Sequence, residues 1–140
     1  MIRDAIQRVI RPSQRAYAHC DVPCGIYDPK EAQIAAETVE KMMTLIAALG
    51  ETTSPEHLNS FVRYVQVKEE HAERVKQAVR VIWGDYFKPP HLEMFPDLHT
   101  KVWNIMKTAG ACKQGVSLDD AKRLRAEVDE FADMFWKTKA

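Results

Sequence analysis

The stretch from Ser54 to Trp83, SPEHLNSFVRYVQVKEEHAERVKQAVRVIW, decides the fold of this chain. It opens with Ser54-Pro55, a capping residue followed by proline at the first helical position. Apolar side chains then recur three and four residues apart over about eight turns, which is the period of an amphipathic helix. They are Leu58, Phe61, Val62, Val65, Ala72, Val75, Val79, Ile82 and Trp83. The pattern predicts one long, half-buried helix.

Three further segments show the same period, at residues 28–49, 98–109 and 117–135. Two of them open on helix-start signals, Asp28-Pro29 and Ser117-Leu118-Asp119-Asp120. The expected helix terminators are, in chain order, Gly50, Pro89-Pro90 and Gly110. No segment alternates like a strand. The sequence therefore predicts an all-α protein, an antiparallel four-helix bundle over residues 28–140.

The composition describes one soluble globular domain. Of the 140 residues 46% are hydrophobic and 29% are charged, with 20 basic and 20 acidic side chains. A net charge of zero gives no support for a nucleic-acid partner, and no apolar run approaches the ~20 residues that span a membrane. Three cysteines are too few for a disulfide scaffold and favour a reducing compartment or a metal site. We therefore expect a cytoplasmic protein.

Residues 1–18 differ in character from the rest. They carry four arginines against one aspartate and end in Ala16-Tyr17-Ala18, which is similar to a small-x-small cleavage site. No apolar run precedes that site, so a secretory signal peptide is not expected. We predict a removable leader at residues 1–18 and a domain at residues 19–140.

His19, Cys20 and Cys24 lie within six residues of one another, and thiolates beside an imidazole suit a late transition metal. Pro23 and Gly25 would let the loop curl so that both sulfur atoms face one point. Zinc is the default metal for such donors, but a structural zinc site takes four side chains and only three are near. Another group must complete the site.

A cut before His19 would supply that group. The new α-amino nitrogen, the Cys20 backbone nitrogen and the thiolates of Cys20 and Cys24 would make a planar set of two nitrogen and two sulfur donors. This geometry is expected for Ni(II) or Cu(II), and it leaves the His19 imidazole free to approach axially.

The pattern His19-Cys20-Asp21-x-Pro23-Cys24-Gly25-x-Tyr27 resembles the nickel hook of the nickel superoxide dismutases. A second block, Trp83-Gly84-Asp85-Tyr86-Phe87-Lys88-Pro89-Pro90-His91 followed by Pro96-Asp97-Leu98-His99, is also similar to that family. The resemblance covers residues 19–140, and we refer to residues 19–27 as the hook.

The resemblance implies that two superoxide anions become dioxygen and hydrogen peroxide, at one nickel ion per chain that alternates between Ni(II) and Ni(III). By the same resemblance, Cys20 and Cys24 would be equatorial ligands, and Cys20 would add its backbone nitrogen. His19 would give its amine and an axial imidazole. Pro23 would fix the loop.

The resemblance also assigns residues around the metal. Tyr27 and Tyr86 would flank its open face and order water or substrate. Asp21 and Lys88 would be further loop contacts, and Lys88 would attract the anionic substrate. A homohexamer and a leader-processing protease are implied as well.

One departure concerns the support of the axial imidazole. Where better-known family members place a Glu and an Arg, this sequence has Ala35 and His71. Because a ligating histidine is usually oriented by a hydrogen-bond partner, we hypothesise that His71, or the neighbouring Glu69 or Glu70, replaces that support.

Several alternatives stay open at this stage. The hook cysteines could be loop thiols or a small disulfide, and Tyr27 and Tyr86 could simply pack in the bundle. A non-catalytic metal-binding or thiol-redox helical protein is the second functional hypothesis. A ferritin-like di-metal bundle would need two Glu-x-x-His motifs, which the predicted helices do not supply. Cys112 is expected to be structural or incidental.

Overall fold

A computed structural model describes residues 25–51 and 53–140. Within this part of the chain every regular element is helical, so the predicted all-α class is confirmed. The predicted leader, and His19, Cys20, Asp21, Pro23 and Cys24 of the hook, lie outside the described residues. The elements are α2 (Lys30–Leu49), α3 (Pro55–Val81), the π-helical turn η1 (Ile82–Tyr86), α4 (Pro89–Met94), α5 (Leu98–Gln114) and α6 (Leu118–Lys137).

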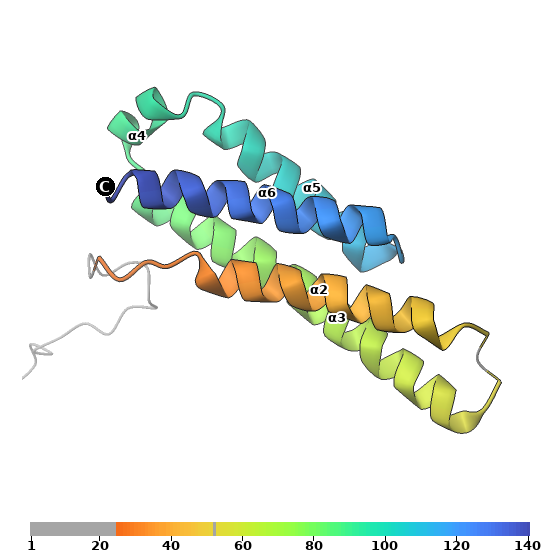
Figure 1. Ribbon diagram of the computed structural model, residues 1–140. Coiled ribbons are helices and arrows are strands. Elements are labelled where there is room, and N and C mark those ends of the chain that lie inside the picture. Colours follow the sequence, from red (N-terminus) through yellow and green to blue (C-terminus); the bar gives the residue numbers. More distant parts are fainter. Residues whose placement is uncertain (1–24, 52) are drawn as a thin grey trace, which may run out of the picture.

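The four long helices form the predicted bundle. Helix α2 packs against α3 and α6, and α5 packs against the same two helices, so the four close into a ring with consecutive helices antiparallel (Figure 1). The apolar stripes meet inside it. Fully buried core side chains include Val39, Met43, Val75, Leu98, Ile105, Leu124, Phe131 and Phe135. None of the described helices is long and apolar enough to cross a membrane.

Side-chain hydrogen bonds to backbone N–H groups stabilise the predicted helix starts. At α2 the N-cap is Pro29 rather than the predicted Asp28, and the Asp28 carboxylate accepts a hydrogen bond from the Lys30 backbone N–H at 2.8 Å. The Ser54 hydroxyl oxygen accepts one from the His57 N–H at 3.2 Å, with Pro55 at the first helical position. Each such hydrogen bond satisfies a backbone donor that the helix leaves unpaired and contributes about 1 kcal/mol.

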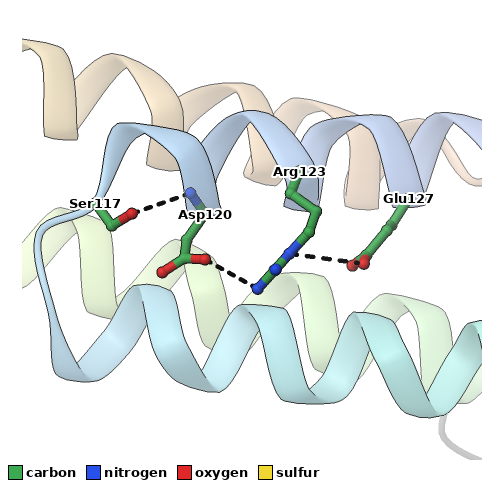
Figure 2. A network of polar contacts seen from close by, with 4 residues as sticks. All are labelled: Ser117, Asp120, Arg123 and Glu127. Carbon is green, nitrogen blue, oxygen red and sulfur yellow. Dashed lines mark hydrogen bonds and ion pairs between the residues drawn. The ribbon is translucent and has the colours of Figure 1, made fainter.

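At the start of α6 the capping residue Ser117 is followed by a row of charged side chains along the first three turns (Figure 2). Ser117 accepts from the Asp120 N–H at 3.2 Å. Arg123 then pairs with the Asp120 carboxylate at 2.9 Å and lies 4.0 Å from a Glu127 oxygen. These pairs are three and four residues apart, the spacing that places side chains on one helix face.

Gly110 does not end its helix, contrary to the prediction. Helix α5 continues to Gln114, because its last carbonyl groups have a partner from another helix. The buried Lys68 ammonium of α3 donates to the carbonyl oxygens of Cys112 at 2.6 Å, Lys113 at 2.8 Å and Gly115 at 3.0 Å. A cap supplied from 44 residues earlier in the chain cannot be read from local sequence.

The segment between the second and third long helices is more ordered than a turn-rich link. Helix α3 gives way to the π-helical turn η1 at Ile82, and Pro89 begins the short helix α4 rather than only ending α3. Proline suits a first helical turn because that turn needs no N–H donor there. The start of α2, the turn η1, α4 and the end of α6 all lie at the same end of the bundle (Figure 1).

Candidate functional site

Tyr86 is the centre of an aromatic cluster at this end of the bundle. Its ring centroid lies 5.4 Å from that of Tyr27, where the hook joins the bundle, and the planes are tilted by 53°. On other sides it stacks on His91 at 5.4 Å and 12°, and contacts Phe135 of α6 at 4.6 Å. We call Tyr27, Tyr86, His91 and Phe135 the tyrosine cluster. The structure therefore brings together the two tyrosines that the sequence nominated 59 positions apart.

The C-terminal residues complete the cluster. The Tyr86 hydroxyl lies 2.6 Å from the Thr138 hydroxyl oxygen. The Lys139 ammonium lies over the Tyr86 ring, 4.7 Å from its centroid, and 5.6 Å from that of Phe135. Sequence reasoning assigned no role to Thr138 or Lys139, because no local motif links them to Tyr86. Their contact exists only because α6 packs beside η1.

Gly25 and Ile26 lead from the hook into the bundle. Gly25 has φ +69°, a left-handed backbone conformation that glycine adopts without a Cβ clash. This agrees with the turning role predicted for it. Ile26 is 70% exposed, whereas Tyr27 is half-buried against Tyr86. The described end of the hook is thus attached directly to the tyrosine cluster.

The proposed metal ligands themselves are not placed, since His19, Cys20 and Cys24 precede residue 25. Over residues 25–51 and 53–140, no group of three or more His, Cys, Asp or Glu side chains could hold a metal ion. The described bundle therefore offers no ferritin-like carboxylate cluster. One imidazole and two thiolates remain a donor set whose softness fits nickel.

Lys88 lies two residues beyond Tyr86 and its side chain is exposed. Its backbone N–H donates to Nδ1 of His91 at 3.0 Å, at the start of α4. His91 consequently contacts two predicted site residues, Lys88 by this hydrogen bond and Tyr86 by stacking. The sequence indicated His91 only as part of the second matching block.

Ala35 and His71 occupy adjacent helices that pack together. Ala35 is buried and has no polar side-chain group to orient a ligand. His71 is half-buried, and its Nδ1 lies 2.8 Å from the Val67 carbonyl oxygen. Because a carbonyl only accepts, Nδ1 donates this hydrogen bond, and Nε2 is the ring nitrogen left for another partner. His71 lies ten residues before Val81, about 15 Å along α3 from its end.

Cys112 is not a suitable metal ligand. It is fully buried in the core as a free thiol. Burial raises the pKa of this thiol to about 11, so it stays neutral at physiological pH. Because metals bind the thiolate form, we assign Cys112 to the core and not to a metal site.

The nickel-containing superoxide dismutase family matches residues 14–139. The chain belongs to this family. It is 36% identical to the superoxide dismutase [Ni] of Streptomyces seoulensis over 134 residues, which are 96% of this chain and 98% of the relative. It is 35% identical, over the same shares, to the superoxide dismutase [Ni] of Streptomyces coelicolor.

Solved structures agree with this assignment. The chain is similar to native nickel superoxide dismutase with a TM-score of 0.76 and 36% identity, over 87% of this chain and 100% of the other. A structure with nickel ligation corresponding to the oxidized state has a TM-score of 0.77 and 37% identity, over 86% and 98%. The family membership and the bundle architecture are therefore consistent.

Proposed function

We propose that this chain, cut before His19, disproportionates superoxide at a nickel ion held by the hook. Two superoxide anions and two protons become dioxygen and hydrogen peroxide. The observation that carries the proposal is the 5.4 Å contact between Tyr27 and Tyr86, because it attaches the hook to the matching second block. Family membership supports the chemistry, and this contact supports a site beside Tyr86.

The lengths of the matches support a leader at residues 1–18. The native solved structure is covered completely by 87% of this chain, and 87% of 140 residues is about 122, the length of segment 19–140. The curated sequences, by contrast, match over 134 residues and so extend into the proposed leader. A leader present in the sequences and missing from solved chains is what removal before His19 predicts.

The hook residues would hold the metal. When bound, nickel supplies one-electron oxidation and reduction between Ni(II) and Ni(III). Cys20 and Cys24 would provide thiolates, and His19 would provide its terminal amine and its imidazole. Pro23 restricts the loop so that the two sulfur atoms converge. His71 would take the place of the missing Glu and Arg as the hydrogen-bond partner of the His19 imidazole, through its Nε2.

Residues around the hook would handle the substrate. Tyr27 and Tyr86, whose rings are in contact, would flank the metal and order water there. Asp21 stabilises the loop as a turn residue. The exposed ammonium of Lys88 attracts the anionic substrate by its charge, an effect that salt screens.

The assembly we propose is a homohexamer in the cytoplasm, formed after a protease removes the leader. Apolar side chains on the first turns of α3 support association. Leu58 is 48% exposed, Phe61 37% and Val62 61%, on consecutive turns of one helix. Nucleic acid and membranes are not proposed partners. Light scattering of the processed protein checks the number of subunits.

A cysteine-replacement experiment separates this function from metal storage or thiol redox. We expect Cys20→Ser with Cys24→Ser to abolish nickel binding and superoxide consumption, since oxygen donors are poor substitutes for thiolates. Cys112→Ser is the matched control and should retain both, with some loss of stability. Stoichiometric nickel binding without superoxide consumption in the unmodified, processed chain would favour the storage hypothesis instead.

A further inference from the structure

The Thr138 hydroxyl has two oxygen neighbours and one proton. Its Oγ1 lies 2.6 Å from the Phe135 carbonyl oxygen and 2.6 Å from the Tyr86 hydroxyl oxygen. A hydroxyl donates a single hydrogen bond and accepts through its lone pairs. The direction of both hydrogen bonds can therefore be assigned.

The Phe135 carbonyl oxygen can only accept. Two oxygens 2.6 Å apart repel unless a proton lies between them, so the Thr138 proton is committed to Phe135. The hydrogen bond to Tyr86 must then be donated by the tyrosine. Its own proton points at Thr138, and the lone pairs of its hydroxyl oxygen are left for other partners.

The surroundings of Tyr86 hold it in this arrangement. Its ring is stacked on His91 and packed against Phe135, while the Lys139 ammonium covers a face. A ring enclosed on these sides cannot easily swing its hydroxyl away from Thr138. Phe135 thus contributes twice, through its ring to Tyr86 and through its carbonyl to Thr138.

We propose that Thr138 is a positioning residue that makes Tyr86 a hydrogen-bond acceptor, not a donor, toward the metal site. This inference rests on the proposed role of Tyr86 beside the hook. Superoxide is an anion and can only accept, so Tyr86 gives it no hydrogen bond. Water and hydrogen peroxide carry protons and can donate to Tyr86. The arrangement therefore favours water and hydrogen peroxide next to the metal and disfavours the binding of small anions there.

An anion-binding experiment tests the direction of the hydrogen bond between Tyr86 and Thr138. In Thr138→Val the Tyr86 proton loses its acceptor and becomes available to a small anion. We expect azide to bind the nickel-loaded, processed enzyme about tenfold more tightly, the effect of one hydrogen bond to a charged group. Thr138→Ser keeps the hydroxyl and should restore the affinity of the unmodified enzyme. Adding Tyr86→Phe to Thr138→Val should remove the gain.

A matched control is Thr44→Val on α2, where the threonine hydroxyl also donates to a backbone carbonyl, that of Glu40 at 2.9 Å, without a tyrosine partner. It should leave azide affinity unchanged. An unchanged affinity in Thr138→Val, or a gain that survives Tyr86→Phe, overturns the proposal.

A second measurement needs no metal. In the full chain with labelled tyrosine, nuclear magnetic resonance should find a Tyr86 hydroxyl proton that exchanges with water more slowly than that of free tyrosine. Exchange as fast as in free tyrosine overturns the inference even where Thr138→Val fails to fold. An unmodified enzyme that neither binds nickel nor consumes superoxide would instead overturn the proposed function. Because the proton-exchange measurement needs no nickel, it distinguishes the two failures.

Discussion

Tyr27 and Tyr86 lie with their ring centroids 5.4 Å apart, one at the end of the hook and the other in the turn that follows α3. This contact joins the first described residues to the end of the bundle. It makes Tyr86 a structural residue as well as a candidate site residue.

Tyr86→Ala should therefore be distinguishable from Tyr86→Phe. Removing the ring deletes the contacts with Tyr27, His91 and Phe135, and we expect a loss of about 3 kcal/mol in the free energy of unfolding. Phenylalanine keeps the ring and should cost less than about 1.5 kcal/mol. Urea unfolding monitored by circular dichroism measures both. Equal losses in the two variants would contradict the packing role.

Lys68→Met should destabilise the bundle strongly, although the methionine side chain is similar in shape to that of lysine. The buried ammonium donates to three carbonyl oxygens at the end of α5, and methionine leaves them without that partner. We expect a loss of about 3 kcal/mol, the scale of charge-assisted hydrogen bonds. Lys41→Met, at an exposed position of α2, is the control and should stay within about 0.5 kcal/mol. Similar unfolding midpoints for the two variants would refute the capping role.

The buried Cys112 thiol predicts a loss of stability at high pH. Burial raises its pKa from an ordinary 9.0 to about 11, so the folded state holds this proton more tightly than the unfolded state. Its contribution is complete below pH 9 and is lost as pH rises toward 11. The fall from about pH 8 to pH 10.5 should be about 2 kcal/mol larger in the unmodified protein than in Cys112→Ala. Parallel pH curves would show that the thiol does not contribute.

Burial lowers the pKa of Lys68 and so acts in the opposite direction over the same range. The charge of the Cys112 thiolate also raises the pKa of Lys68, so the comparison with Cys112→Ala reports the thiol together with its effect on this lysine.

His71→Ala tests whether His71 supports the His19 imidazole. If the Nε2 of His71 orients His19, its removal should lower superoxide consumption several-fold and change the electron paramagnetic resonance spectrum of the nickel, with nickel content retained. His57→Ala, at an exposed position in the first turn of the same helix, is the control. Unchanged activity and spectrum in His71→Ala would exclude the hypothesis.

Local sequence predicts the described fold well where the stabilising groups are local. Ser54 and Ser117 cap their helices within three residues, and these starts are confirmed. The predicted end of α5 at Gly110 was wrong because the group that caps this helix, the Lys68 ammonium, comes from another helix. A glycine at position 110 could not reveal that the helix continues beyond it.

In the candidate site, too, local motifs were predicted and contacts between distant segments were missed. Tyr27 and Tyr86 were identified from motifs, and their proximity agrees with the prediction. Thr138 and Lys139 were missed because they meet Tyr86 only through the packing of α6. The ligand assignments for His19, Cys20 and Cys24 remain predictions from donor chemistry and resemblance.

The most direct test of the central claim is the N-terminal mass of the active, nickel-containing enzyme. We predict a chain that begins at His19, carries one nickel ion and consumes superoxide, whereas the uncut chain is inactive because its α-amino ligand is missing. Full activity in a chain that still carries Ala18, or in one without nickel, would contradict the account.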